Sequence, residues 1–250
     1  MAGGEVRKVA LVTGASSGIG RATAEAFIAA GYATALLDIN EEAGKRTEAA
    51  LRQSGECAFI RCDVADDESV GRSVEKVINL YGRLDAAFHA AAVPGEAQPT
   101  AECSIENWNR VIAVDLTGTW YCMRHEIPQM LKSGGGAIVN CSAAAGIRGA
   151  PRLPAYAAAK HGVVGLTKTA ALEYARQGIR VNAVLPTTTD TPMISPERRQ
   201  EIMEAAASKI PIGRICRPSE IADTVIWLCG GGASFITGQA IAVDGGRTAH

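Results

Sequence analysis

Short apolar runs alternate with amphipathic segments along the chain. The first run, residues 9–13, is continuous and shows no apolar–polar alternation, as expected of a parallel strand covered on both faces. Further strands are expected at about 33–37, 57–62, 84–89, 137–142, 179–185 and 240–243. Helices are expected at about 21–30, 41–53, 67–81, 104–131, 156–174, 197–209 and 219–228.

Two residues define the expected ends of the longest of these helices. Ser104 is a typical N-cap, and Pro128 marks a frayed carboxyl-terminal end. The strict order of strand and helix predicts an α/β fold with one doubly wound, Rossmann-like parallel sheet in a single domain, residues 1–250. Ligands of such a sheet bind at the carboxyl ends of the strands.

Composition supports one large domain. The chain has 250 residues, of which 47% are hydrophobic and 20% charged, enough for a substantial core. A net charge of -1 without a basic cluster argues against nucleic acid as a partner. The apolar runs are too short to span a membrane, and residues 1–5 lack the apolar core of a signal peptide.

The seven cysteines are scattered and include no Cys-x-x-Cys pair, so we expect reduced thiols in a cytoplasmic protein. Cys122 and His125 are the only close Cys/His pair. No second pair accompanies them, and no metal site is expected.

A glycine-rich loop follows the first strand directly and opens a helix. Gly14 permits a tight turn, Gly18 lets the backbone approach a pyrophosphate, and Gly20 allows close packing of the helix. The helix N-terminus then presents free amides to phosphate groups. With Ser17 and Ile19 in the same loop, this context indicates a dinucleotide site.

Asp38 ends the second strand, 18 residues after Gly20. Its carboxylate is suited to accept hydrogen bonds from ribose hydroxyls and to repel a 2′-phosphate, which favours NAD(H) over NADP(H). No Arg or Lys adjoins it in Ile39-Asn40. A solvated aspartate that caps the next helix is the alternative interpretation.

Tyr156 and Lys160 lie four residues apart on one face of an expected helix. An ammonium beside a phenol helps to hold the phenolate, which makes a proton-transfer group from a side chain whose ordinary pKa is about 10. The spacing alone is weak evidence, because an exposed lysine over a half-buried tyrosine produces the same pattern.

Taken together, these motifs resemble the short-chain dehydrogenase/reductase family across nearly the whole chain. The matching marks are Thr13-Gly14-x3-Gly18-x-Gly20, Asp63-Val64, Tyr156-x3-Lys160, Asn182 to Pro186, Thr191-Pro192-Met193, Thr237-Gly238-Gln239 and Asp244-Gly245-Gly246. The resemblance implies a seven-stranded sheet that binds NAD, a homotetramer, a small-molecule alcohol or ketone substrate and a mobile lid at about 188–218.

The resemblance also implies roles for single residues. Asp63 and Val64 would contact the adenine, and His89 and Ala90 would lie along the cofactor. Lys160 would hold the nicotinamide ribose, and Tyr156 would be the acid/base. The remaining cofactor contacts at the lid would be Pro186, Thr189 and Thr191.

The catalytic positions depart from the family pattern. Ala143 stands where the family has a serine, 13 residues before the tyrosine. Ser142 is one residue too early, and successive strand residues point to opposite faces. It replaces the missing hydroxyl only if the strand end carries a bulge.

Asp115 stands where the family has an asparagine, and residues 89–92 read His-Ala-Ala-Ala in place of Asn-Asn-Ala-Gly. Asp115 is either a proton relay beside Lys160 or an acid facing a water pocket. His89 is either a second acid/base or a buried packing residue. Arg148 and Arg152 are candidate clamps for an anionic substrate group, or ordinary surface arginines.

The leading hypothesis is therefore an NAD(H)-dependent oxidoreductase that interconverts a secondary alcohol and a ketone, with Tyr156, Lys160, Asp115 and Ser142 as candidate catalytic residues. One alternative is an enzyme that retains NAD but runs an isomerisation, elimination or cyclisation. The other is a non-catalytic NAD-binding protein.

Overall fold

A computed structural model of the chain describes residues 7–194, 197 and 199–249. Its seven strands form one sheet in the order β3-β2-β1-β4-β5-β6-β7, and every neighbouring pair is parallel. The doubly wound fold expected from the sequence is confirmed. The strands are β1 (Val9–Thr13), β2 (Ala33–Asp38), β3 (Cys57–Arg61), β4 (Ala86–His89), β5 (Gly136–Cys141), β6 (Ile179–Pro186) and β7 (Ala240–Val243).

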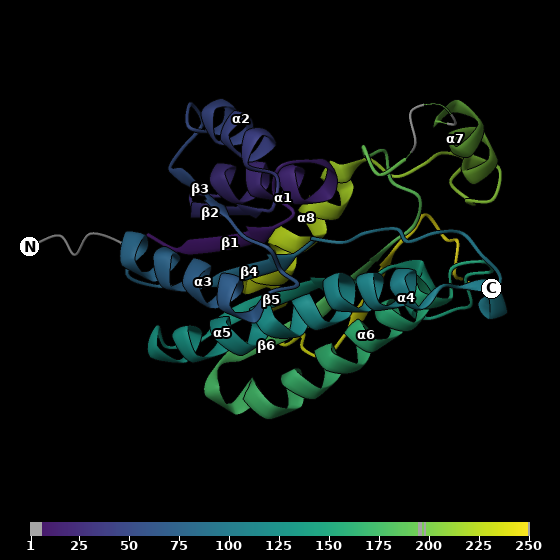
Figure 1. Ribbon diagram of the computed structural model, residues 1–250. Coiled ribbons are helices and arrows are strands. Elements are labelled where there is room, and N and C mark those ends of the chain that lie inside the picture. Colours follow the sequence, from purple (N-terminus) through teal and green to yellow (C-terminus); the bar gives the residue numbers. More distant parts are fainter. Residues whose placement is uncertain (1–6, 195–196, 198, 250) are drawn as a thin grey trace, which may run out of the picture.

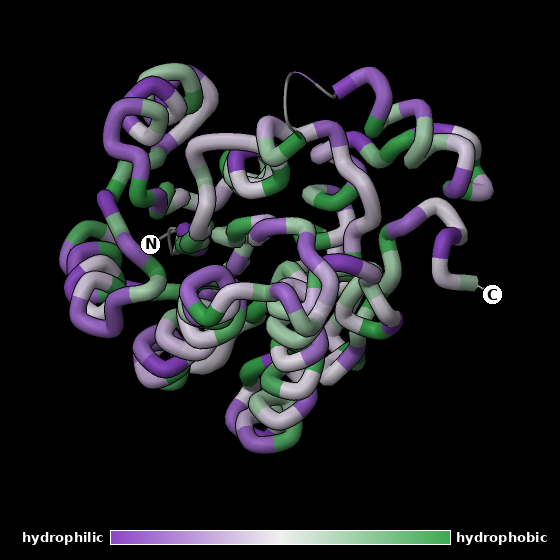
Figure 2. Tube along the Cα trace, turned by 45° about the vertical axis from the view of Figure 1, so that its right-hand side comes forward, coloured by the Kyte–Doolittle hydropathy of each residue, from purple (hydrophilic) through white to green (hydrophobic). Residues whose placement is uncertain are grey.

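Helices cover both faces of this sheet (Figure 1). Two apolar cores result, one between the sheet and α1 and α8, the other between the sheet and α3, α5 and α6. Along the outer helices hydrophilic and hydrophobic residues alternate, as Figure 2 shows. The helices are α1 (Gly18–Ala29), α2 (Glu41–Leu51), α3 (Asp67–Tyr81), α4 (Ile105–Val111), α5 (Gly118–Lys132), α6 (Pro154–Tyr174), α7 (Arg199–Ala207) and α8 (Pro218–Cys229).

The long helix expected from 104 to 131 is present but changes its winding. The hydroxyl of Ser104 accepts a hydrogen bond from the backbone N–H of Asn107, which confirms the predicted cap. Between α4 and α5 the chain forms a π-helix, Ile112–Thr117. Such wide turns often occur at functional sites, and this one contains Asp115. Pro128 lies inside α5 and does not end it.

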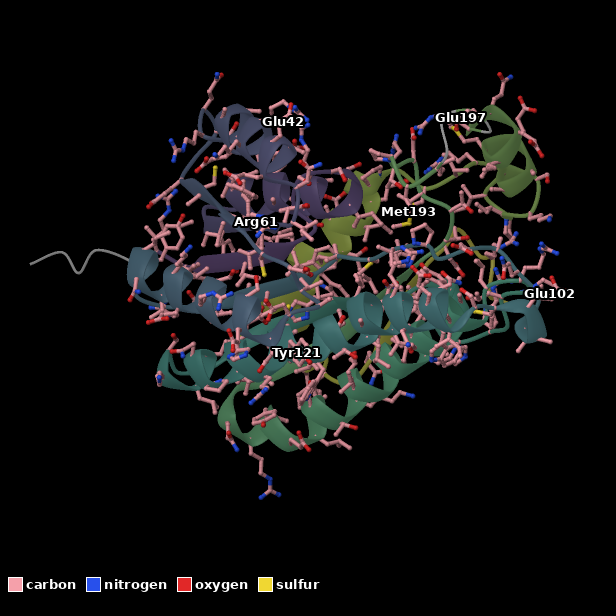
Figure 3. The ribbon with its side chains drawn as sticks, in the orientation of Figure 1. Glu42, Arg61, Glu102, Tyr121, Met193 and Glu197 are labelled. Atoms are coloured by element: carbon pink, nitrogen blue, oxygen red, sulfur yellow. The ribbon has the colours of Figure 1, made fainter. Side chains whose placement is uncertain are left out.

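The segment after β6 leaves the sheet and returns to it. Thr189 pairs with Cys216 in an isolated parallel bridge, so the two ends of the expected lid lie side by side. Figure 3 labels Met193 and Glu197 on this segment. Residues 195, 196 and 198, which fall within the predicted lid, lie outside the described residues.

None of the described helices is long and apolar enough to cross a membrane. Residues 1–5, on which the expectation about a signal peptide depends, lie outside the described residues.

Candidate active site

The glycine-rich loop between β1 and α1 leaves no room for side chains at two of its glycines. A Cβ on Gly14, whose φ is +64°, would lie 2.9 Å from the backbone nitrogen of Ala91. A Cβ on Gly20 would lie 2.1 Å from the carbonyl oxygen of Gly14. The loop therefore packs closely both on the residues after β4 and on its own helix.

The N-terminus of α1 points out of this loop. Ser17 is its N-cap residue, with extended backbone and no side-chain bond to the helix amides. These amides are free in the way that a phosphate-binding helix N-terminus requires. The close glycine packing and the open helix end together fit a dinucleotide with its pyrophosphate over Gly18 and Ile19.

Asp38 holds the glycine-rich loop at the end of β2. Its Oδ2 accepts hydrogen bonds from the Ser16 amide (3.1 Å) and the Ser16 hydroxyl (2.5 Å), and its Oδ1 accepts from the Asn40 amide at 2.9 Å. The carboxylate is partly exposed. Asn40, and not Asp38, caps α2 by accepting a hydrogen bond from Ala43, so the capping alternative for Asp38 is wrong.

Two further strand ends reach the same edge of the sheet. Thr13 accepts hydrogen bonds from the backbone amides of Ala90 and Ala91 at 3.1 and 3.2 Å, which joins the end of β1 to the end of β4. Asp63 is partly exposed after β3 and accepts a hydrogen bond from the Ala65 amide. The ends of β1, β3 and β4 thus lie along the same edge of the sheet, from Asp63, where the adenine is expected, to the centre of the sheet.

Tyr156, Lys160 and Asp115 form a compact group at this edge. The Lys160 Nζ lies 3.3 Å from a carboxylate oxygen of Asp115 and 5.3 Å from the centre of the Tyr156 ring. It also donates a hydrogen bond to the carbonyl oxygen of Cys141 at 3.2 Å. The other oxygen of Asp115 accepts from the amide of Val93 at 2.8 Å.

The charges in this group set its proton affinities. Burial alone would lower the pKa of Lys160. The negative charge of Asp115, the neighbouring Tyr156 and Cys141 and the hydrogen bond to Asp115 together outweigh burial, and the pKa is raised. The ammonium is therefore charged at any physiological pH. Burial raises the pKa of Tyr156 above its ordinary value of 10.0, the Lys160 charge opposes this, and the Asp115 charge adds to it.

Ser142 does not reach the cleft. The pairing of β5 with β6 continues through Cys141 without an extra residue, so the bulge that a catalytic Ser142 needs is absent. The Ser142 hydroxyl is buried and donates to the carbonyl oxygen of Lys160 at 2.8 Å. This bond argues against the predicted role of Ser142 as a catalytic donor, and Ala143 supplies no hydroxyl in its place.

His89 also lies behind the cleft. Its ring is buried, with Nδ1 2.7 Å from Oδ1 of Asn140 and Nε2 2.8 Å from Oε2 of Glu126. Of the two alternatives for His89, the geometry favours the buried one. Cys141 is no nucleophile either, since burial raises the pKa of its thiol to about 11.

The lid residues approach the glycine-rich loop. A Cβ on Gly18 would lie 3.0 Å from the methyl group of Thr191, and Thr189 is buried. Arg199 bonds the carbonyl oxygen of Thr191 and forms an ion pair with Asp190. The lid is therefore anchored beside the expected phosphate site.

Of the two candidate clamps, Arg152 is engaged with a neighbouring loop. Its guanidinium donates to the carbonyl oxygen of Ala97 at 2.9 Å, and its own carbonyl accepts from Gln98 at 2.8 Å. Its φ of +67° is in the left-handed region that favours glycine. Arg148 is exposed.

Sequence reasoning missed Ser16 and Glu126. Ser16 carries a signal, a hydroxyl inside the glycine-rich loop. Glu126 is fully buried on α5, and an acid at a core position of an amphipathic helix is the signal that was available.

The chain is similar in sequence to known proteins over nearly its whole length. Residues 14–248 match the family model described as Enoyl-(Acyl carrier protein) reductase. The chain is 43% identical over 245 residues to a 2,5-dichloro-2,5-cyclohexadiene-1,4-diol dehydrogenase of Sphingobium indicum, with 97% of each chain covered. It is 44% identical over 243 residues to a cyclohexanol dehydrogenase of Acinetobacter sp., with 96% of this chain and 95% of the relative covered.

A solved structure shares the whole architecture. A single-residue variant of actinorhodin polyketide ketoreductase with NADPH superposes with a TM-score of 0.93 at 36% identity, covering 98% of each chain.

Proposed function

The chain belongs to the short-chain dehydrogenase/reductase family, whose relatives here are oxidoreductases acting on CH–OH groups, and we propose a specific reaction for it. The proposed reaction interconverts a cyclic secondary alcohol and its ketone with NAD(H) as the cofactor. The observation that carries this proposal is the group of Tyr156, Lys160 and Asp115 at the strand ends. A phenol beside a buried, permanently charged ammonium is a proton-transfer group, and the glycine-rich loop at the same edge fits the cofactor.

The protein's own part in the reaction is the proton. A bound nicotinamide supplies or accepts the hydride, which is chemistry that belongs to the cofactor. The Tyr156 hydroxyl gives a proton to the carbonyl oxygen in reduction and takes it from the alcohol in oxidation. Lys160 stabilises the phenolate electrostatically, and its bonds to Asp115 and the Cys141 carbonyl hold it in position.

Asp115 changes the pKa of Tyr156 relative to a site in which Lys160 has no carboxylate partner. Its carboxylate neutralises the charge of Lys160, so the ammonium lowers the pKa of Tyr156 less than an unpaired one would. At neutral pH Tyr156 is protonated and poised to act as an acid. We infer that ketone reduction is the favoured direction near neutral pH and that alcohol oxidation needs alkaline conditions.

One donor to the substrate oxygen is missing. Ala143 has no hydroxyl, and the proton of Ser142 is bonded to the carbonyl oxygen of Lys160. Tyr156 is then the hydrogen-bond donor on which orientation of the carbonyl depends. Loss of one oxyanion donor costs about 10² to 10³ in turnover in other enzymes, so slow turnover is expected here.

Asp38 supports the preference for NAD(H). Its partly exposed carboxylate is fixed by Ser16 and Asn40, and a 2′-phosphate beside it would be repelled. The related ketoreductase structure contains NADPH, so the preference has to be measured on this chain.

The relatives support a cyclic alcohol or ketone as the proposed substrate class. Two enzymes more than 40% identical to this chain are named for alcohols of six-membered carbocycles. A cyclohexanol or a cyclohexanone is therefore the first substrate to test. Arg148, exposed in the segment between β5 and α6, is a candidate contact for an acidic ring substituent, whereas the guanidinium of Arg152 is bonded to the backbone of Ala97.

A homotetramer is part of the proposal. Large apolar side chains are exposed on the face made by α4, α5 and α6, where a second copy would cover them. They include Ile105, Trp108, Trp120 and Leu172. Light scattering that gives the mass of one 26.0 kDa chain would contradict this assembly.

One screen separates the proposed activity from its rivals. The enzyme is offered cyclic alcohols with NAD and NADP and cyclic ketones with NADH and NADPH, and both cofactor absorbance and product are followed. Cofactor conversion in step with product supports the dehydrogenase. Product without net cofactor change supports an isomerase, lyase or cyclase that retains NAD. Tight NAD binding without product supports a non-catalytic binding protein.

A further inference from the structure

Three potential metal ligands meet in the core between the sheet and α5. His89 ends β4, and Cys122 and Glu126 lie one turn apart on α5, just after Tyr121, which Figure 3 labels. The exposed fractions of the three residues are 3%, 1% and 0%. One ring nitrogen, the thiol sulfur and a carboxylate oxygen all lie within 4.8 Å of one another.

The hydrogen bonds around His89 fix which nitrogen faces this cluster. Thr167 gives its hydroxyl proton to the carbonyl oxygen of Val163 at 2.7 Å, so it must accept from the amide nitrogen of Asn140 at 2.9 Å. The amide oxygen of Asn140 therefore faces His89 Nδ1, which must carry a proton. This leaves Nε2 directed at Glu126, the arrangement that metal-binding histidines have when the other nitrogen donates to a carbonyl oxygen.

Without a metal ion, one polar atom of this cluster has no hydrogen-bond partner among the described residues. Nε2 of His89 and Oε2 of Glu126 are 2.8 Å apart and share one proton. Oε1 of Glu126 is buried and has no partner among the described residues. A buried carboxylate oxygen without a partner is costly, and the thiol of Cys122 beside it is a weak donor.

We propose that His89 Nε2, the Cys122 thiolate and the Glu126 carboxylate bind one zinc ion. Zinc takes nitrogen, sulfur and oxygen ligands in a tetrahedral arrangement, and the three side chains supply three of its four positions. The charges of the thiolate and carboxylate balance Zn²⁺. Binding displaces two protons, one shared by His89 and Glu126 and one from the thiol.

The geometry needs little adjustment. Ligand atoms around a tetrahedral zinc are roughly 3.3 to 3.7 Å apart, as follows from bond lengths of about 2.0 to 2.3 Å. The present separations are 2.8 Å between Nε2 and Oε2 and at most 4.8 Å across the cluster. All three side chains are buried, and a bound ion would tie β4 to α5.

The spacing of Cys and His residues in the sequence did not predict this site. It singled out Cys122 and His125, but His125 faces the surface, where its Nε2 lies 2.8 Å from Asp67. The partner that the fold supplies instead is His89, from a different strand. Such a site is invisible until β4 and α5 are placed side by side.

The test is metal content of protein made without a histidine tag. The chain is unfolded with chelator, refolded with equimolar zinc, dialysed and analysed by plasma mass spectrometry. About one zinc per chain is expected, with loss of most of it in Cys122→Ser. The matched control is Cys229→Ser, a buried cysteine in the core on the other face of the sheet, which should retain zinc.

Cobalt gives a second readout on the unmodified chain. Refolding with Co²⁺ should produce the near-ultraviolet absorption of a thiolate–cobalt bond, absent in Cys122→Ser and present in Cys229→Ser. Less than about a tenth of a zinc ion per chain would overturn the proposal, and so would cobalt spectra that Cys122→Ser does not change. In either case His89 and Glu126 share a proton and bind no metal ion. Neither measurement depends on dehydrogenase activity, so this inference and the proposed function fail separately.

Discussion

Lys160 and Asp115 form an ion pair with 3.3 Å between nitrogen and oxygen, and their exposed fractions are 2% and 1%. The pair joins α6 to the π-helix that interrupts the long helix before it. A charge pair this deeply buried is screened little by solvent or salt. It therefore acts directly on the phenol of Tyr156 beside it.

Replacing Asp115 by Asn should shift the pH dependence of alcohol oxidation to lower pH. Without the carboxylate, the charge of Lys160 is no longer neutralised, and the pKa of Tyr156 falls from its raised value. Oxidation needs the phenolate, whose fraction falls about tenfold for each pH unit below the pKa. The measurement is kcat/KM for alcohol oxidation from pH 6 to about 11, and Asp115→Asn should exceed the wild type several-fold near pH 8.

The control for this change is Asp223→Asn, an exposed acid on α8. It removes the same charge far from the cleft and should leave the profile unchanged. Profiles that coincide for wild type and Asp115→Asn would show that Asp115 does not act on Tyr156.

Introducing the absent hydroxyl should accelerate turnover. Ala143→Ser places a donor beside Tyr156 and should raise kcat about 10-fold or more, within the range found for oxyanion donors. Ala158→Ser, at an exposed position on α6, adds a hydroxyl away from the cleft and should have no effect. No gain, or a loss, in Ala143→Ser would show that residue 143 does not face the substrate oxygen.

Removing the neighbouring hydroxyl should affect stability more than chemistry. Ser142→Ala deletes the bond to the Lys160 carbonyl and should lower the free energy of unfolding by about 1 kcal/mol, as expected for one buried hydrogen bond. Urea unfolding measures this, and kcat should change less than about threefold. A loss of turnover as large as that of Tyr156→Phe would restore Ser142 to the catalytic group.

The choice of cofactor should depend on Asp38. Asp38→Ala combined with Ile39→Arg removes the carboxylate and adds a cation for a 2′-phosphate, so the ratio of kcat/KM for NADP to that for NAD should rise at least about tenfold. Glu42→Gln, an exposed acid on α2 labelled in Figure 3, is the control. A wild type that already prefers NADP would contradict the interpretation of Asp38.

The sequence located the sheet and most of the nucleotide edge because those features are local. Short apolar runs and the glycine spacing at Gly14, Gly18 and Gly20 need no knowledge of distant contacts. The first and last strands have the expected limits, and the other five deviate by one or two residues at their ends, as at β4, where the expected start at 84 becomes Ala86.

Features made by long-range packing were not predictable in the same way. The π-helix at Ile112–Thr117 has no composition of its own, and the bond between His89 and Glu126 joins residues 37 positions apart. The direction of the Ser142 side chain could not be predicted from the sequence. Alternation along a strand determines which face a side chain lies on only if the strand contains no bulge. The pairing of β5 with β6 is regular through Cys141, which argues against a bulge there.

Tyr156→Phe tests the central claim most directly. Reduction of cyclohexanone by NADH is followed by absorbance in the wild type and the variant, and NADH binding to both is measured by calorimetry. The account predicts that the variant binds NADH as the wild type does but loses about 10² to 10⁴ in turnover, because the proton donor is gone. Turnover that survives in Tyr156→Phe, with NADH bound equally well, would contradict it.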